Sequence, residues 1–226
     1  MLDVAGLKAW YGPSQALFGV DLAAAEGEVV ALMGRNGMGK TSTVRAICRM
    51  LRRTEGRVAF AGRDVTSLPS HKAAQLGLGL VPEGRRCFRG LTVRENLTVA
   101  ARPGPWDLAK VADLFPRLAE RAGQDAATLS GGEQQMLAVG RALMTNPRLL
   151  ILDEATEGLA PTVRAEIWAA LRRLAAEGQT ILVIDKSLRE LRALAHRCTV
   201  LERGRTVWDG PPAELTEDVA ARYLGV

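Results

Sequence analysis

The segment "GRNGMGKT", residues Gly34–Thr41, has the residue types and spacing of a phosphate-binding loop. It fits the pattern G-x-x-x-x-G-K-[ST], in which glycines let the backbone curl until successive N–H groups face one anion. The helical stretch "TSTVRAICRML" follows the loop, so the positive end of a helix points at the same place. We expect Lys40 to reach the β and γ phosphates of a nucleotide and the Thr41 hydroxyl to bind Mg²⁺.

Asp153 and Glu154 could supply the acidic groups that such a loop uses. They end the apolar run "PRLLILDE", which predicts a buried strand, and ligands bind at the carboxyl ends of strands in open α/β sheets. Asp153 is placed to hold Mg²⁺ through water, and Glu154 to activate a water as general base. Alone, the pair could simply cap the next element; beside a phosphate-binding loop, we favour the catalytic interpretation.

The stretch "LSGGEQQMLAVGRALM", residues 129–144, predicts a second helix end that could bind an anion. Ser130 and Glu133 form the S-x-x-E pattern of a capping box. Capping does not require the two glycines between them. Gly131 and Gly132 leave the first turn without side chains, so a phosphate could approach bare N–H groups. One nucleotide would hardly use two helix ends, which leaves the purpose of the second one open.

The stretch "TILVIDKSLRE", residues 180–190, carries a lysine at the end of another predicted buried strand. Ser187 and Glu190 repeat the S-x-x-E pattern and predict a capped helix that opens beside Lys186. A lysine near a helix N-terminus is unfavourable unless an anion is present, and a γ-phosphate would supply one. The alternative is that Lys186 pairs with Asp185 or faces solvent.

The elements that must position these residues can be read from the apolar pattern. Short alternating segments with glycine turns predict antiparallel strands in the N-terminal third. The continuous runs "VVALM", "LLIL" and "TILVI" predict strands covered on both faces, and the helical stretches after them indicate a parallel α/β sheet. Residues 92–128 have helical spacing broken by "RPGPWD", which predicts a helical insert, and "CTVLERGRTVWDGPP" predicts a closing hairpin.

Composition narrows the class of protein. The chain has 226 residues, is 47% hydrophobic and has a net charge of +5, which suits one globular domain over residues 1–226 with a helical subdomain at about 84–146. No run reaches the roughly 18 apolar residues of a membrane span, and no signal peptide is visible. The arginines are scattered without interleaved aromatics, so we expect no nucleic-acid partner. Neither the three cysteines nor the two histidines are spaced like a metal site.

These motifs together resemble the ATP-binding subunits of ABC transporters over almost the whole chain. Gly34–Thr41 match the Walker A motif, Leu149–Glu154 the Walker B motif and Leu129–Gln135 the signature in its "LSGGEQQ" form. The resemblance implies an α/β fold of the P-loop NTPase class and ABC type, with a mixed sheet core, an antiparallel N-terminal β subdomain and a helical signature subdomain. It also explains the second helix end, because two such subunits hold two ATP molecules between one subunit's P-loop and the other's signature.

The resemblance assigns roles residue by residue, with ATP as the ligand and Mg²⁺ as the metal. Glu154, Lys40 and Lys186 would be catalytic, and Mg²⁺ would be held by Thr41, Asp153 and Glu83. The ATP contacts would be an adenine-stacking aromatic in "WYG", the loop and the signature: Tyr11, Gly34, Arg35, Asn36, Gly37, Met38, Gly39, Lys40, Thr41, Ser42, Ser130, Gly131 and Gly132.

Three positions depart from the family's pattern. Glu83 stands where Gln is usual, so its charge would repel a γ-phosphate unless the metal is present. Ala155 stands where Pro is usual, which should loosen the loop after Glu154 slightly. Lys186 stands where a His usually contacts the γ-phosphate, and we interpret it as a permanently charged sensor of that phosphate.

A narrower resemblance concerns the subfamily. "VPEGRR", "LTVRENL", "LFPRLAER" and "TEGLAP" resemble the second ATPase of branched-chain amino acid importers. This implies an ATPase on the cytoplasmic face of the cell membrane, paired head to tail with a second ABC ATPase or with its own copy. Two permease subunits would join it, and a periplasmic solute-binding protein would act indirectly.

Three alternatives stay open at this point. The chain could be an ATP-binding switch with little hydrolysis, favoured by Lys186 and Ala155 and opposed by Glu154. It could serve an importer of amides, urea or aromatic acids. An ABC protein of DNA repair or translation fits less well, because those usually carry two cassettes, coiled coils or nucleic-acid inserts.

Overall fold

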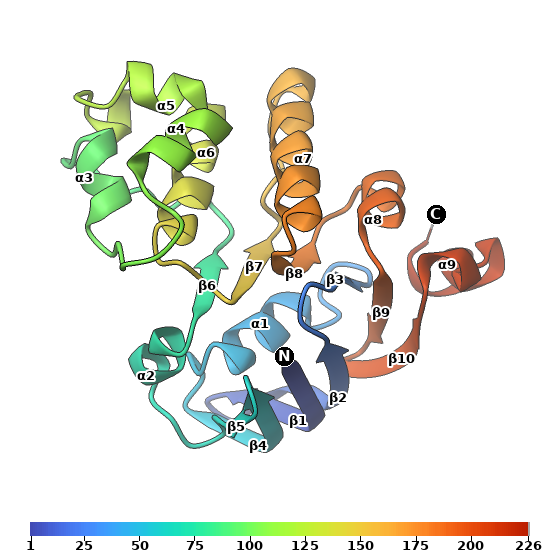
Figure 1. Ribbon diagram of the computed structural model, residues 1–226. Helices are drawn as coiled ribbons and strands as arrows, with labels where there is room; N and C mark the ends of the chain where they lie inside the picture. The colour runs from blue at the N-terminus through green and yellow to red at the C-terminus, as the bar shows by residue number, and fades with distance from the viewer. Residues whose placement is uncertain (226) are drawn as a thin grey trace.

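The computed structural model of the chain describes residues 1–225, and ten strands of that part form one mixed sheet (Figure 1). The strand order across the sheet is β5-β4-β1-β2-β10-β9-β3-β8-β7-β6. The strands are β1 (Leu2–Tyr11), β2 (Ser14–Ala24), β3 (Val29–Met33), β4 (Arg53–Phe60), β5 (Arg63–Asp64), β6 (Leu78–Val81), β7 (Leu149–Asp153), β8 (Thr180–Ile184), β9 (Arg197–Glu202) and β10 (Arg205–Gly210). The expected mixed sheet is confirmed.

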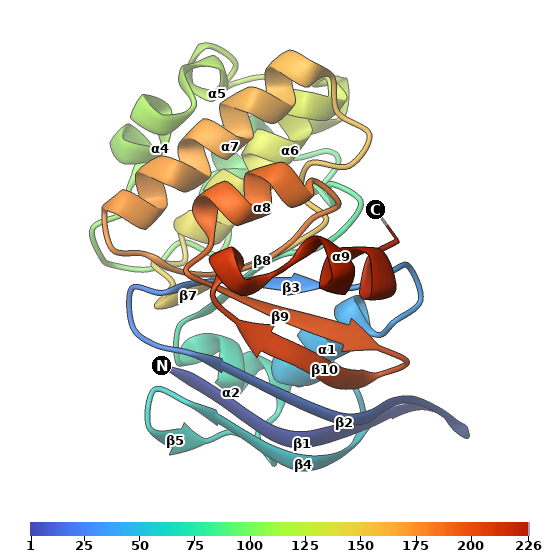
Figure 2. The same ribbon diagram turned by 90° about the vertical axis from the view of Figure 1, so that its right-hand side faces the viewer.

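The helices lie on both faces of the parallel strands (Figure 2). Helix α1 lies between these strands and the antiparallel N-terminal strands, and α7 and α8 cover the opposite face. The helices are α1 (Lys40–Ile47), α2 (Ser70–Gln75), α3 (Val93–Thr98), α4 (Leu108–Leu114), α5 (Pro116–Glu120), α6 (Gly131–Leu143), α7 (Pro161–Ala176), α8 (Leu188–Leu194) and α9 (Glu217–Tyr223), with short 3₁₀ turns at Ala126–Thr128 and Pro212–Glu214.

The three continuous apolar runs form buried parallel strands, as predicted, and lie in the middle of the parallel part of the sheet. Every residue of β3, β7 and β8 is buried, and β3 pairs in parallel with β8, which pairs in parallel with β7. Parallel strands covered by helices on both faces need apolar side chains on both sides, which explains why these runs do not alternate. Because the strands run in parallel, the residues that follow β3, β7 and β8 meet at one edge of the sheet.

The N-terminal strands behave differently because only one of their faces is covered. β1 pairs antiparallel with both β2 and β4, and its inward residues, such as Leu2, Val4 and Leu7, are buried against the α1 side of the sheet. The predicted hairpin near the C-terminus is β9–β10, and the turn falls within "ERGR". The sequence patterns gave no expectation for the short elements α2, β6 and α9.

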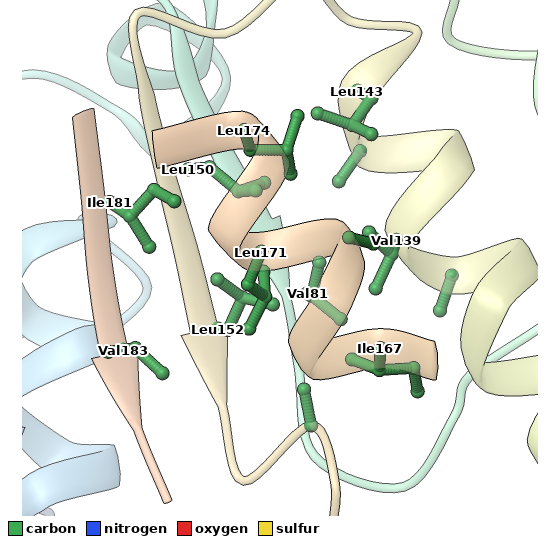
Figure 3. Packing of buried hydrophobic residues seen from close by; sticks show 14 of the residues in the cluster. Val81, Val139, Leu143, Leu150, Leu152, Ile167, Leu171, Leu174, Ile181 and Val183 are labelled. Atoms are coloured by element: carbon green, nitrogen blue, oxygen red, sulfur yellow. The ribbon is translucent and has the colours of Figure 1, made fainter. Parts of the chain in front are cut away.

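The core above the sheet joins the helical insert to the strands (Figure 3). Ile167, Leu171 and Leu174 of α7 pack between Leu150 and Leu152 of β7 and the side chains of α6. The segment "RPGPWD" separates α3 from α4, as predicted, because its prolines cannot continue a helix. Within residues 1–225, no helix combines the length and apolar character that crossing a bilayer requires.

Candidate active site

The loop of residues 34–39 connects β3 to α1 and leaves its backbone free to curl around an anion. Gly34 and Gly39 have φ values of 140° and 105°, in the range that favours glycine. A Cβ at Gly34 would lie 2.5 Å from the carbonyl oxygen of Leu201, and one at Gly39 would lie 2.8 Å from a methyl carbon of Leu17. Glycine is therefore required at both positions by backbone conformation and by space.

Lys40 lies inside this loop with only 7% of its surface exposed. Its Nζ donates hydrogen bonds to the carbonyl oxygens of Gly34 at 2.8 Å and Arg35 at 3.2 Å. Burial lowers the pKa of Lys40, and the carboxylates of Glu154 and Asp153 oppose that shift. The ammonium group of Lys40 is thus bound by backbone carbonyls instead of water. Phosphate oxygens of a nucleotide could take the place of these carbonyls.

Thr41 and Asp153 are brought together across the edge of the sheet. The Thr41 hydroxyl donates a hydrogen bond of 3.2 Å to Oδ1 of Asp153, which is 3% exposed at the end of β7. Burial raises the pKa of the Asp153 carboxyl, and the hydrogen bond from Thr41 opposes that shift. A hydroxyl and a carboxylate oxygen are the donors that Mg²⁺ prefers, so the pair fits this metal.

Glu154 follows Asp153 and leaves the strand with a φ of 51°, an unusual value for a non-glycine residue. Its N–H donates to the carbonyl oxygen of Ile184 at 2.9 Å, which fixes the turn against β8. A hydrogen bond with Glu157, then burial and the charge of Glu157, raise the pKa of Glu154 to about 7, while Lys186 opposes the shift. The pKa of Glu157 is lowered by its hydrogen bonds with Glu154 and Lys186, so Glu154 is the group that carries a proton more readily.

Lys186 lies beside these carboxylates rather than beside Asp185. Its Nζ donates a hydrogen bond to Glu157 and lies 3.8 Å from Oε2 of Glu154. The predicted capping box between Ser187 and Glu190 is wrong. Ser187 makes no capping hydrogen bond through its side chain. Glu190 pairs instead with Arg172 at 2.9 Å, which draws its carboxylate away from the helix end.

Lys40, Thr41, Glu154 and Lys186 line one cavity of about 570 Å³, while Asp153 lies beside it and lines a neighbouring hollow. The expected loop residues Asn36, Gly37 and Ser42 and the acidic residue Glu83 also line the cavity. Carboxylate oxygens of Glu83, Glu154 and Glu157 lie within 4.8 Å of one another. Residues that line the cavity without having been expected there are Gln15, Ala16, Phe18, Glu157 and Arg203. Phe18, an exposed aromatic residue in a strand, could have been suspected as a ligand contact. The types and positions of the other four residues do not indicate that they line a cavity.

Tyr11 lies at the end of β1, next to the cavity rather than in its lining. The residue is 40% exposed, and its hydroxyl oxygen lies 3.4 Å from Oγ of Ser42. Arg45 of α1 donates to the same hydroxyl oxygen at 3.4 Å. Tyr11 lines a neighbouring hollow that also contains Thr41, so adenine stacking on its ring stays a prediction.

Two expected loop residues point elsewhere. The Arg35 guanidinium lies against the C-terminal segment, with Nη2 at 3.5 Å from the carbonyl oxygen of Ala221 in α9. The Met38 side chain lies against the turn between β9 and β10, where its Sδ accepts from the Arg203 N–H at 3.2 Å, and its carbonyl oxygen accepts from the Gly204 N–H at 3.0 Å. For both residues, a nucleotide contact would have to come from the backbone.

The second predicted helix end is α6, and its capping box forms as expected. Ser130 Oγ accepts from the Glu133 N–H at 3.3 Å, and Glu133 Oε2 accepts from the Ser130 N–H at 2.9 Å. Packing gives these glycines a second reason, besides the predicted approach of a phosphate, which stays a prediction. A Cβ at Gly132 would lie 2.5 Å from Val163, and one at Gly131 would lie 2.1 Å from the Arg85 guanidinium.

Ser130, Gly131 and Gly132 do not line the cavity at the loop. A nucleotide in that cavity therefore contacts one helix end of this chain and leaves the other on a different surface. This arrangement agrees with two nucleotide sites that are each completed by a second subunit.

A phosphate-binding loop and two carboxylates at the carboxyl edge of a mixed sheet define a P-loop ATPase. The chain belongs to the ABC transporter family: the model of this family, described as "ABC transporter", matches residues 17–157. The chain is 40% identical over 232 residues to the high-affinity branched-chain amino acid transport ATP-binding protein BraG of Pseudomonas aeruginosa, with 100% of both chains covered. It is 34% identical to the Nod factor export ATP-binding protein I of a Rhizobium species, covering 96% of this chain and 73% of the relative.

Solved structures of ABC cassettes have the same fold. The ADP conformation of the cassette MJ1267 superposes with a TM-score of 0.82 at 25% identity, covering 97% of this chain and 94% of that one. A dimeric post-hydrolysis state of the cassette MJ0796 with ADP and Pi gives a TM-score of 0.80 at 25% identity, covering 94% and 99%. The expected family, ABC fold and ATPase activity are confirmed, and cassettes of this family bind nucleotide, form dimers and work with membrane components.

Proposed function

We propose that this chain is the Mg²⁺-dependent ATPase of an importer for branched-chain or related amino acids. The observation that carries the proposal is the full-length similarity to BraG, whose name describes that transport. Lys40, Thr41, Asp153 and Glu154, the groups that ATP hydrolysis requires, face one cavity or lie at its edge. The chain would act on the cytoplasmic face of the membrane with a second ATPase or its own copy, two permeases and, indirectly, a periplasmic binding protein.

The residues of the cavity suggest how each would contribute. Lys40 would release the Gly34 and Arg35 carbonyls and donate to the terminal phosphates, while the loop N–H groups and the α1 terminus hold the remaining oxygens. Thr41 and Asp153 would hold Mg²⁺, with Glu83 nearby, and the bound metal would supply charge neutralisation to the phosphates. Lys186 would contact the last phosphate.

Glu154 would act as the general base toward water. Its carboxylate lines the cavity, and its backbone is fixed by the hydrogen bond to Ile184, so it has a defined position relative to Lys40. The second subunit would supply its α6 terminus, with Ser130, Gly131 and Gly132, to the same nucleotide. For the Gly131 N–H to reach a phosphate there, the Arg85 side chain would have to move aside.

Uptake measurements test the proposal most directly. The chain would be expressed with its neighbouring permeases in cells that lack their own branched-chain importer, and entry of labelled leucine would be followed with amides, urea and aromatic acids as competitors. We expect leucine uptake that disappears with Glu154→Gln. Uptake of a competitor but not of leucine would assign another solute. Uptake that survives Glu154→Gln would contradict the hydrolytic role and favour an ATP-binding switch.

A further inference from the structure

Lys186 is held between two carboxylates although half of its side chain is exposed. The side chain is 50% exposed, that of Glu157 is 44% exposed and that of Glu154 is 14% exposed. A free lysine at such exposure keeps about 2 kcal/mol of rotamer entropy, which it loses whenever it must hold one position. The contact with Glu157 gives the ammonium group a defined place in the cavity before any nucleotide arrives.

The backbone around Lys186 is tied to the loop that carries Glu157. One carboxylate oxygen of Asp185 accepts from the Thr156 hydroxyl, and the other accepts from the Ser187 N–H at 2.9 Å. Asp185 therefore joins the residue before Glu157 to the residue after Lys186. This explains why Lys186 does not pair with Asp185, and it brings Glu157 and Lys186 face to face.

The ammonium group retains capacity for a further partner. It has three N–H donors, one of which is used by Glu157, while Glu154 lies at 3.8 Å. Lys186 lines the same cavity as Lys40 and the phosphate-binding loop. Its charge also offsets the repulsion among the carboxylates of Glu83, Glu154 and Glu157, whose oxygens lie within 4.8 Å of one another.

We propose that Glu157 is the positioning residue for Lys186, holding its ammonium group at the phosphate end of the cavity so that it can contact ATP. This inference rests on the proposed function, in which Lys186 contacts the last phosphate. Glu157 itself would not touch the nucleotide, and it would act through the hydrogen bond to Lys186.

The test is a double-mutant cycle with Glu157→Gln and Lys186→Gln, read as KM for ATP and kcat in saturating Mg²⁺ at about pH 8.5. We expect each single variant to raise KM about fivefold or more, and the double variant to be no worse than Lys186→Gln alone. Fivefold corresponds to about 1 kcal/mol at 1.4 kcal/mol per factor of ten. Glu157→Asp, which keeps the charge, should recover part of the loss. Exchanging the two residues should restore the ion pair and the free energy of unfolding but not KM.

Glu166→Gln is the matched control. It breaks an exposed ion pair of 3.1 Å with Arg117, outside the residues that line the cavity, and should leave KM unchanged. Additive effects in the cycle, or a Glu157→Gln variant with an unchanged or lower KM, would overturn the positioning role. If Lys186→Gln itself has a wild-type KM, the phosphate-sensor role of the proposed function fails instead, and the inference fails with it.

Discussion

The raised pKa of Glu154 should give ATP hydrolysis a measurable pH dependence. The pKa of Glu154 is raised to about 7, first through its hydrogen bond with Glu157 and then through burial and the charge of Glu157. A general base must be ionised to accept a proton from water. We therefore expect kcat/KM to fall as the pH drops through 7. This parameter reports the ionisation of the free enzyme, in which the pKa of Glu154 is raised by Glu157.

The size of the effect follows from this pKa. With a pKa of about 7, about one tenth of Glu154 is ionised at about pH 6 and about nine tenths at about pH 8, so kcat/KM should differ about ninefold. Glu157→Gln removes the carboxylate that contributes most to the shift. The pKa of Glu154 then moves down toward its ordinary range. The roughly ninefold difference in kcat/KM between the two pH values should therefore shrink until the two values are nearly equal.

The assay is phosphate release by the purified chain between about pH 6 and 8.5, for the wild type, Glu157→Gln and the Glu166→Gln control. Each profile is normalised at its alkaline plateau, which removes any constant loss of ATP affinity. The nucleotide's own titration is common to all three proteins and cancels in the comparison. An acid limb at the same pH in wild type and Glu157→Gln would refute the argument, as would a wild-type profile that is flat across this range.

Three further predictions concern catalysis and packing. Glu154→Gln should lower turnover at least about 100-fold while ATP binding persists, which single-turnover and equilibrium binding measurements separate. Gly132→Val should lower the free energy of unfolding, measured in urea, by about 1–3 kcal/mol, because even a Cβ there would lie 2.5 Å from Val163. Gly131→Ala should lower the free energy of unfolding clearly less, because the atoms that its Cβ would meet are at the end of the flexible Arg85 side chain. Leu171→Ala should lower it by about 2–5 kcal/mol, because Leu171 is 1% exposed in the core of Figure 3.

The central strands and their order along the chain could be predicted because their physical signal is local. β3, β7 and β8 are covered on both faces, and only continuous apolar runs satisfy that environment. α2 and β6 were not predicted, because six or four residues contain too few repeats of the helical or strand period for a pattern to be recognised. The capping box at Ser187 was wrong because Arg172, far along the chain, attracts Glu190 more strongly than the helix end does.

The site was predictable where one motif carries it and unpredictable where partners come from elsewhere. Lys40 and Thr41 follow from the spacing of the loop, and Asp153 from the end of a buried strand. Gln15 and Ala16 reach the cavity only through the register of β2 against the rest of the sheet, which no local pattern specifies. The packing role of Gly132 was not predictable either, because Val163 of α7, which a Cβ at Gly132 would meet at 2.5 Å, follows it by 31 residues in the chain.

Lys186 and Glu157 are best understood as one unit. A histidine, usual at this position in the family, can be neutral near pH 7, whereas a lysine brings a full positive charge beside the general base. Alone, that charge would lower the pKa of Glu154 and occupy its carboxylate. Glu157 accepts the hydrogen bond from Lys186. Its effect on the pKa of Glu154 is also larger than that of Lys186, since this pKa is raised rather than lowered. A lysine at this position therefore depends on a carboxylate in the loop after β7, and replacing Lys186 by His should make Glu157 far less important for kcat than it is in the wild type.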